Sequence, residues 1–409
     1  MQILTPVSKR KFSLTAAWAF NQLAYAIVYP FIPLYLSNER GIPYTTVSLI
    51  FPLLGLAVIL APIPCGWMTD KWGRNLMMQT GQYGRGLIFF IMAAMVYFNA
   101  PFWAFAVILM LNTAVGVAFQ VGADAYLADT STEAERPMYY SWIRMGFNFG
   151  WAAGPMLGAF FARTPFWLFF IITALLSAAG GLFTHFTCCK DAAQYTRSIK
   201  KDKITPDEPV LKTIFQNKRF LLLLAGTCLL MCLASQLYST MSIYSTTRIG
   251  ISKTALGSIY SLNGFLVMAL QIPLVALLKR CKLPLAAQLL LGVLLYGTGF
   301  AALGFSSGAW MIACAVAVLT LGEIIDQPAL FTTVSNETTP ANAGRLMASY
   351  SLSRGVGYAI GPWIGAQLMA HLSSNILLWS MLSSFALMAA VIFLIAVPHR
   401  PQIRQEAEL

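Results

Sequence analysis

The sequence predicts an all-α membrane protein in which twelve transmembrane helices form two pseudo-symmetric bundles of six. Composition is the first reason, because 58% of the 409 residues are hydrophobic and the mean hydropathy is +0.67. Only 10% of the residues are charged, against about a quarter in a typical soluble domain. The other reasons are twelve long apolar runs and one polar segment in the middle of the chain. This composition excludes a soluble enzyme, a disordered protein and a nucleic-acid-binding protein.

Each predicted helix is an apolar run long enough to cross a bilayer, which takes about 20 residues in helical form. The runs are continuous and lack the two-residue alternation of a membrane barrel, so helices are expected. No signal-peptide cleavage site follows the first run, and we therefore expect it to remain in the mature protein. The runs are residues 12–36, 45–68, 77–98, 101–127, 138–162, 165–187, 219–246, 255–278, 285–306, 308–334, 344–369 and 374–397.

Basic residues orient the predicted helices. The chain has 27 Lys and Arg residues, and with the N-terminus inside most of them fall in inner loops and in the two tails. Cytoplasmic loops of membrane proteins carry an excess of Lys and Arg, so both termini are expected in the cytoplasm. The short loops favour a bacterial inner membrane. The only basic residues in outer loops are Arg40, Arg163, Arg248 and Lys253.

A polar and basic segment, residues 188–218, divides the twelve runs into six and six. We interpret it as a cytoplasmic linker between an N-terminal bundle, residues 1–187, and a C-terminal bundle, residues 219–409. Binding of this segment to a lipid or phosphate surface is the weaker alternative.

The two predicted bundles share a glycine pattern, repeated at one constant offset. Small residues let membrane helices approach each other closely. A pattern that recurs in both halves is typical of an internally duplicated transporter. The pattern consists of Gly150, Gly154, Pro155 and Gly158 in the fifth run and of Gly357, Gly361, Pro362 and Gly365 in the eleventh.

No motif supplies a catalytic centre or a built-in energy source. The chain lacks a G-x-x-x-x-G-K-[ST] nucleotide loop, a His/Cys metal cluster and an evident Ser/His/Asp set. We therefore expect no enzyme activity, no cofactor and no metal. The informative residues are the ionisable ones within the runs, because a charge at mid-bilayer is costly unless it is paired or hydrated. They are Arg85, Asp124, Arg144, Glu323, Asp326 and Arg354.

Asp124 ends a polar stripe on the fourth run. The stripe advances in four-residue steps, so its members share one slowly rotating face of the helix. In one interpretation the stripe is a cavity wall and Asp124 binds a proton or a cation. In the other, Asp124 is the structural partner of Arg144 on the next helix. The stripe consists of Asn112, Gly116, Gln120 and Asp124.

Glu323 and Asp326 lie three residues apart on the tenth run, at neighbouring positions of a helix. In a low-dielectric site it is costly in free energy to ionise two carboxylates this close together. One of them is therefore expected to hold a proton, which suits a proton carrier. In one interpretation the pair binds a proton and Arg354 senses its charge. In the other, Asp326 and Arg354 form a fixed ion pair that leaves Glu323 alone. We favour a proton-coupling role for Glu323.

Other polar residues within the runs are weaker candidates. Arg354 lies on the glycine side of its helix, where a structural role is plausible. Arg85 is about two turns from the end of its run and is expected to reach the membrane interface. Arg144 lies on the side of the fifth run opposite the glycine row and could meet a cavity. Residues that could line such a cavity, with ordinary helix packing as the alternative, are Asn21, Tyr25, Gln120, Asn148, Trp151 and Gln236.

The loop between the second and third runs resembles a family signature. Residues 66–75 read Gly-Trp-Met-Thr-Asp-Lys-Trp-Gly-Arg-Asn, which resembles the G-x-x-x-D-x-x-G-R signature of the major facilitator superfamily. The resemblance covers essentially the whole chain and implies a transporter that works by alternating access. It also implies a cytoplasmic charge network that latches one of the two states. The network would comprise Gly66, Asp70, Gly73 and Arg74, with Asp129 and Arg136 as partners.

The glycine-rich stretch at residues 150–158 is similar to the antiporter signature of drug:proton antiporters. The sequence departs from that signature at Ser141 and Ala159, where the group has glycine. A second signature of these exporters begins with Arg on the fourth helix, in the region where this chain has Asn112. Proton coupling would then be arranged otherwise, with Arg144 as the expected substitute.

The resemblance implies a proton-coupled antiporter that expels a small organic compound from the cytoplasm. The segment Gly322-Glu323 with Pro328 is similar to a pattern of multidrug-type members. We expect a monomer whose partners are the compound, protons and membrane lipid, and no nucleic acid. A proton symporter that imports a nutrient, a lipid or lysolipid flippase, and a membrane receptor remain the alternatives.

Overall fold

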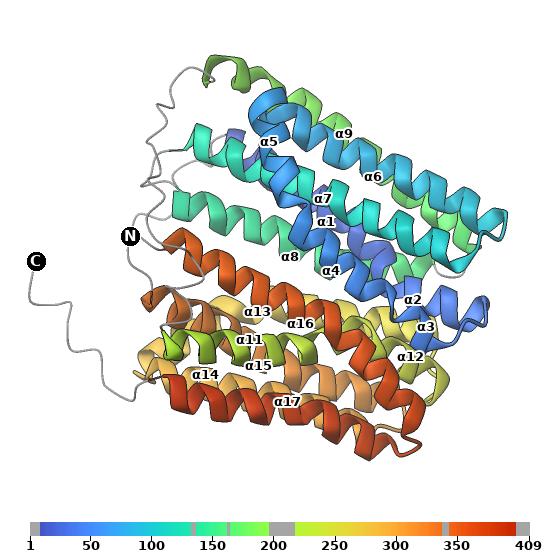
Figure 1. Ribbon diagram of the computed structural model, residues 1–409, viewed down its shortest axis with the longest axis vertical. Helices are drawn as coiled ribbons and strands as arrows, with labels where there is room; N and C mark the ends of the chain where they lie inside the picture. The colour runs from blue at the N-terminus through green and yellow to red at the C-terminus, as the bar shows by residue number, and fades with distance from the viewer. Residues whose placement is uncertain (1–8, 132–135, 162–163, 196–216, 338–342, 398–409) are drawn as a thin grey trace, which may run out of the picture. The chain divides into compact units, whose positions relative to one another are not determined.

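The computed structural model describes residues 9–131, 136–161, 164–195, 217–337 and 343–397. Every regular element in these ranges is helical (Figure 1). The helices group into two compact units. Unit 1 comprises Met1–Lys203 and Tyr238–Met268, and unit 2 comprises Ile204–Leu237 and Ala269–Leu409.

Unit 1 contains the first six predicted spans and part of the next two. Within it, α1 packs on α8 and α9, while α6 packs on α7 and α9. Its elements are α1 (Lys9–Val28), η1 (Tyr29–Phe31), α2 (Ile32–Leu34), η2 (Tyr35–Glu39), α3 (Tyr44–Val47), α4 (Ile50–Leu60), α5 (Pro62–Trp72), α6 (Arg74–Tyr97), α7 (Phe102–Thr130), α8 (Arg136–Phe161), α9 (Phe166–Tyr195), α12 (Thr240–Thr247) and the first part of α13 (Lys253–Arg280).

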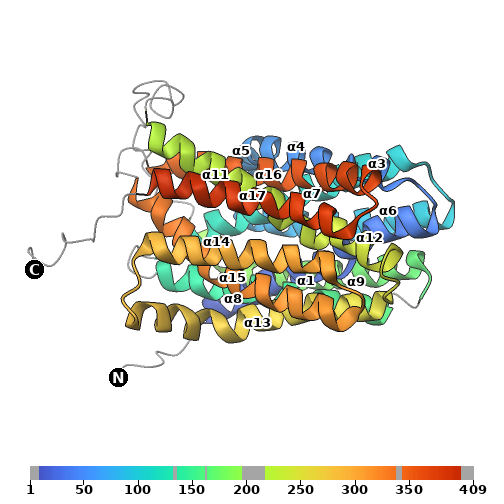
Figure 2. The same cartoon turned by 90° about the horizontal axis from the view of Figure 1, so that it is seen from below.

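Unit 2 repeats this style of packing. Here α11 packs on α16 and α17, and α14 packs on α15 and α17 (Figure 2). The predicted linker, residues 188–218, lies largely outside the described residues. The elements of unit 2 are α11 (Lys218–Ala234), most of η3 (Ser235–Tyr238), the last part of α13, α14 (Leu285–Ala302), η4 (Leu303–Phe305), α15 (Ala309–Asn336), α16 (Ala343–His371) and α17 (Asn375–Ala396).

Each of the twelve predicted runs is occupied by one helix or by a consecutive series of helices, which confirms the predicted fold class. Seven of the described spans are long and apolar enough by themselves to cross a membrane. The bent pair of α3–α4 and α5 forms an eighth, with a 42° break ahead of Pro62. The other four spans, α1, α6, α8 and α16, are more polar, and three of them carry Arg85, Arg144 and Arg354.

The predicted glycine pattern lies at close helix contacts in both units. A Cβ added to Gly154 on α8 would lie 2.5 Å from the Cβ of Ala26 on α1. A Cβ added to Gly357 on α16 would lie 2.7 Å from the Cβ of Met231 on α11. Because no side chain larger than hydrogen fits at such distances, both helix pairs depend on glycine. Pro155 and Pro362 lie inside the same two helices.

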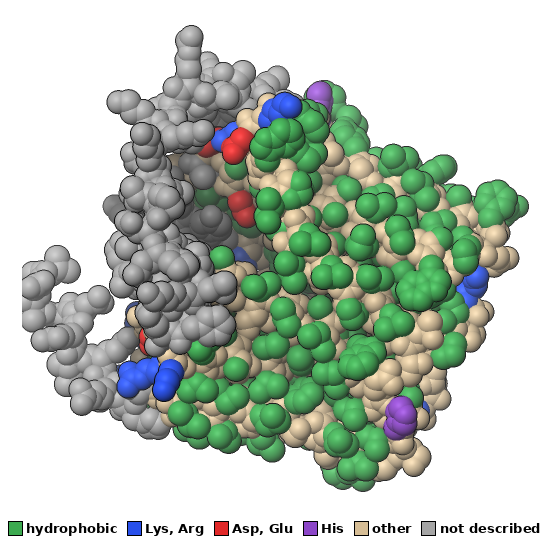
Figure 3. Space-filling view, viewed as in Figure 1, with side chains coloured by type: hydrophobic (Ala, Val, Ile, Leu, Met, Phe, Trp, Pro, Cys, Tyr) green, Lys and Arg blue, Asp and Glu red, His purple; other side chains and the backbone are tan. Residues whose placement is uncertain are grey.

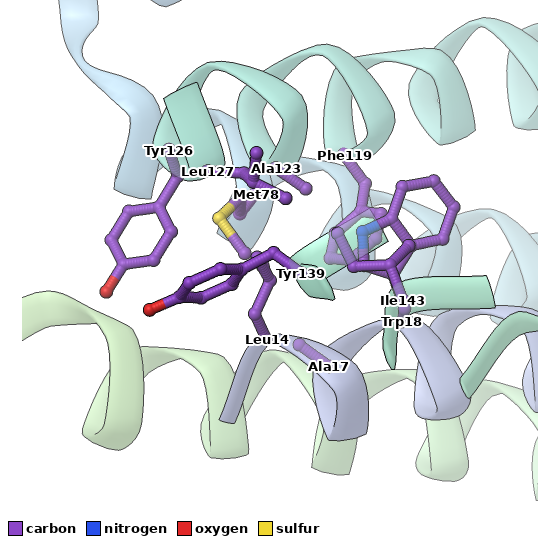
Figure 4. Close-up of a cluster of buried hydrophobic side chains, with 10 residues drawn as sticks. All are labelled: Leu14, Ala17, Trp18, Met78, Phe119, Ala123, Tyr126, Leu127, Tyr139 and Ile143. Atoms are coloured by element: carbon purple, nitrogen blue, oxygen red, sulfur yellow. The ribbon is translucent and has the colours of Figure 1, made fainter. Parts of the chain in front are cut away.

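A cluster of buried apolar side chains joins α1, α6, α7 and α8 of unit 1 (Figure 4). It includes an edge-to-face contact between Trp18 and Phe119, whose ring centroids lie 5.3 Å apart. Aromatic pairs in this geometry add about 0.5–1.5 kcal/mol to simple burial. The cluster fixes the second half of α7, which carries Gln120 and Asp124. Its members are Leu14, Ala17, Trp18, Met78, Phe119, Ala123, Tyr126, Leu127, Tyr139 and Ile143.

The outer faces of the helices are apolar. Ile63, Ile272 and Trp310 are 78%, 79% and 81% exposed. In the space-filling view apolar side chains cover most of the displayed face, and charged side chains gather mainly near its left edge (Figure 3). A soluble monomer rarely exposes so large an apolar surface, so these side chains face lipid.

The glycine contact of unit 2 predicts a difference between two neighbouring substitutions on α16. We expect Gly357→Ala to lower the free energy of unfolding by about 1–3 kcal/mol, because the added methyl group overpacks the contact with α11. Gly355→Ala is the matched control, since nothing lies within 4 Å of its added Cβ. Thermal unfolding of the two purified variants in detergent checks this. Equal loss of stability in both would contradict the contact.

Candidate functional site

The signature loop between α5 and α6 brings two carboxylates to one arginine. Gly73 ends α5 with φ +93°, a left-handed backbone conformation that favours glycine. The turn places Arg74 at the start of α6, where its Nε lies 2.8 Å from Oδ2 of Asp129. Its Nη2 lies 3.5 Å from Oδ1 of Asp70. The loop therefore connects α5, α6 and the end of α7 through charge.

Two other members of the predicted network are Gly66 and Arg136. Gly66 lies on α5, and nothing is within 4 Å of the position that its Cβ would occupy. Arg136 begins α8, but its side chain lies outside the described residues. The network that the structure describes is thus one arginine between two carboxylates.

The polar stripe of α7 turns around the helix. Asn112 is 1% exposed, whereas Gln120 and Asp124 are exposed. Each four-residue step advances about 40° beyond a full turn, so three steps separate Asn112 from Asp124 by about 120°. Among the described residues no ion pair within 4 Å joins Asp124 to Arg144, and Arg144 is itself exposed on α8. The two ends of the stripe therefore face different surroundings.

Arg85 is buried inside unit 1, so the expectation that it reaches the membrane interface is wrong. It is 7% exposed, and its Nη1 donates a hydrogen bond to Oδ1 of Asn21 at 3.0 Å. The guanidinium also lies over the ring of Tyr25, 4.8 Å from its centroid. One cause is that α6 begins earlier than expected, at Arg74. Arg85 therefore lies about three turns inside the helix and not near its end. The absent side chain of Gly116 provides the space, since a Cβ there would overlap the guanidinium.

An aromatic pocket adjoins this arginine within unit 1, and its lining is mostly apolar. Tyr25 and Asn112 line the pocket, and Tyr25 also contacts the guanidinium of Arg85. The full lining comprises Tyr25, Tyr29, Ile32, Pro33, Val47, Ile50, Phe51, Leu54, Leu109, Asn112 and Thr113.

The predicted cavity residues fall into different environments. Trp151 on α8 packs edge-on against Tyr25, with ring centroids 6.2 Å apart, and Asn148 lies half-buried one turn earlier. Gln236 is fully buried in unit 2, where its Nε2 donates to the carbonyl oxygen of Gly361 at 2.8 Å. The amide of Gln236 therefore bridges the glycine contact between α11 and α16.

Unit 2 buries the acid pair predicted on the tenth run. Asp326 on α15 is 0% exposed, and neither of its carboxylate oxygens has a hydrogen-bond partner. Among the described residues, no ion pair within 4 Å includes it. Glu323, one turn earlier, is half-buried. Arg354 on α16 instead donates to Oε1 of Gln327 at 2.7 Å and to the hydroxyl of Tyr350 at 3.0 Å. Asp326 and Arg354 therefore do not form the fixed ion pair of the alternative interpretation.

Comparison with known proteins places the chain in a family. The sequence model of the Major Facilitator Superfamily matches residues 14–362. The MFS-type transporter YqjV of Bacillus subtilis (strain 168) is 26% identical over 354 residues, which cover 85% of this chain and 83% of YqjV. The class B tetracycline resistance protein of Escherichia coli is 27% identical over 322 residues, 77% of each chain.

A solved structure shows the same fold. The crystal structure of the nucleoside transporter NupG superposes with a TM-score of 0.76 at 15% identity, covering 95% of this chain and 99% of NupG. The signature loop, the helical spans and these matches agree. The chain belongs to the Major Facilitator Superfamily and is a multi-pass integral membrane transporter.

Proposed function

We propose that this transporter exports a small organic compound from the cytoplasm in exchange for protons. The observation that carries the proposal is the buried carboxyl of Asp326, which has Glu323 one turn away and no cation at ion-pair distance among the described residues. Two features favour export: the antiporter-like stretch of α8 and the similarity to a tetracycline resistance protein. The proposed location is a bacterial inner membrane with both termini in the cytoplasm, and the proposed active form is a monomer.

The chemistry of the acid pair explains why it could couple to protons. An ionised carboxylate is expensive to bury without a partner, so Asp326 is best accommodated in its neutral, protonated form. Loss of the proton requires water or a cation to reach the carboxylate. Arg354 is the nearest candidate, since it already bonds Gln327, the neighbour of Asp326 in sequence. Proton binding and release would therefore favour different arrangements of α15 and α16.

Alternating access would use the two sequence halves, residues 1–187 and 219–409, as its moving parts. In this proposal the charge cluster of Asp70, Arg74 and Asp129 is a latch that stabilises one state. Ion pairs formed in one state only shift a two-state equilibrium by their own free energy. Asp124, exposed on α7, remains a second candidate for proton binding.

Proton exchange through the acid pair predicts the outcome of a flux assay. Purified protein is reconstituted in liposomes that contain a pH-sensitive dye, and a library of compounds that includes tetracycline is added under an imposed pH gradient. A transported compound is expected to drive protons in the direction opposite to its own. We expect Glu323→Gln and Asp326→Asn to reduce this proton movement to the level of empty liposomes, because neither variant can release a proton at that position.

The matched control is Glu337→Gln, the same substitution at the end of α15 and away from the acid pair. It is expected to transport like the wild type. Undiminished proton movement in Glu323→Gln would exclude its coupling role. Proton movement in the same direction as the compound would make the protein a symporter.

The latch predicts unequal contributions from its two acids. The side chains of Arg74 and Asp129 are 20% and 18% exposed, whereas that of Asp70 is 78% exposed. In double-mutant cycles we expect a coupling of about 1 kcal/mol between Arg74→Gln and Asp129→Asn, and about 0.5 kcal/mol or less between Arg74→Gln and Asp70→Asn. Chemical unfolding in mixed micelles measures both couplings. A larger coupling to Asp70 would show that the cluster is arranged differently in the membrane.

A further inference from the structure

Arg85 is a buried cation that no acid of the described residues meets. Arg85 is 7% exposed, and no ion pair within 4 Å includes it among the described residues. Its contacts are neutral: the amide oxygen and backbone oxygen of Asn21, at 3.0 and 3.4 Å, and the ring of Tyr25. A buried charge without a counter-charge is costly in free energy. Binding of an anion next to Arg85 would remove this cost.

Three buried donors lack acceptors, on Arg85 itself and on the two helices that border its guanidinium. Nε of Arg85, Nδ2 of Asn21 and Nδ2 of Asn112 are all buried without a hydrogen-bond partner. These three groups come from α6, α1 and α7, and each can only donate. Buried donors normally have acceptors, and a shortage of acceptors points to a ligand that supplies them. A carboxylate or a similar oxyanion offers several acceptor sites and no donor.

The aromatic pocket gives such a ligand a place for its apolar part. Tyr25 lines the pocket and contacts the guanidinium of Arg85, and Asn112 lines the pocket one turn before Gly116, which borders that guanidinium. The rest of the lining is apolar or aromatic, including Phe51 and Leu109. The pocket is therefore mostly apolar, and Tyr25 connects it to Arg85, which is not itself part of the lining.

The position of the guanidinium suits a transported ligand. Arg85 lies near the middle of α6, and Asn112 lies in the middle part of α7. Transporters bind their substrates near the bilayer midplane, where broken helices also line the site. The first span of unit 1 breaks from α1 into η1 at Tyr29, and Tyr29 itself lines the pocket.

We infer that Arg85, Asn21 and Asn112 form an anion subsite, and that the transported compound is an amphipathic organic anion. Its oxyanion group meets the guanidinium and the two amides, and its apolar part occupies the pocket beside Tyr25 and Phe51. This inference rests on the proposed transport of a small organic compound. It does not depend on proton coupling, which involves the acid pair of unit 2.

Equilibrium binding without any gradient tests the subsite. The probes are a panel of aryl carboxylates of increasing ring number, each paired with its neutral primary amide, and binding is measured by calorimetry on protein in lipid nanodiscs. For wild type we expect the best carboxylate to bind about tenfold to a hundredfold more tightly than its amide, because hydrogen bonds to a charged group are worth that ratio. Arg85→Gln should lose this preference and still bind the amide, which shows that the pocket is intact.

Three controls sharpen the result. Arg85→Lys should keep much of the preference because it keeps the charge, and Asn112→Leu should reduce it. Arg280→Gln, which removes one exposed positive charge at the end of α13, should leave it unchanged. A wild type that never prefers the acid, or an Arg85→Gln variant that still does, would overturn the subsite. Full displacement of the carboxylates by chloride would overturn the proposal that the ligand is an organic anion and would assign the site to an inorganic anion.

Discussion

The structure depends on one constraint: a charge within a lipid-bathed bundle must be met by a partner or be neutralised. Most charged side chains satisfy it by lying at the ends of the helices, as Arg74 does between Asp70 and Asp129. Each unit nevertheless buries one charged group without an opposite charge at ion-pair distance in the described residues, Arg85 in unit 1 and Asp326 in unit 2. In this account, these two groups are the ones that bind a ligand or a proton.

The two sites differ in what satisfies them. A guanidinium stays protonated, so Arg85 can be neutralised only by an anion, and the donors around it favour the same ligand. A carboxyl can take up a proton, so Asp326 is neutralised without any ligand. In this account one unit binds the compound and the other binds the proton. Close glycine contacts hold the helices that carry these groups: Gly81 of α6 packs against Phe119 of α7, and Gly292 of α14 packs against Asp326 of α15.

The sequence predicts the helices well, because length and hydropathy determine which segments enter lipid. It also predicts that Arg74 is close to acids, since a short loop and a recognisable signature leave few alternatives. The surroundings of Arg85 could not be predicted, because they depend on where α6 begins and on the space that Gly116 leaves on a neighbouring helix. The bond from Gln236 to Gly361 likewise depends on how closely two helices approach. The side-chain partners of a residue on a neighbouring helix depend on how the helices pack. A hydropathy pattern carries no information on this packing.

The most direct test of this account is the protonation state of Asp326 in the folded protein. Infrared spectra of wild type and Asp326→Asn, both reconstituted in lipid at neutral pH, report the carbonyl stretch of a protonated carboxyl group. The account predicts a protonated-carboxyl band in the wild type that is absent from the variant. Identical spectra in this region would mean that Asp326 is ionised, and the proposed proton carrier of unit 2 would then be contradicted.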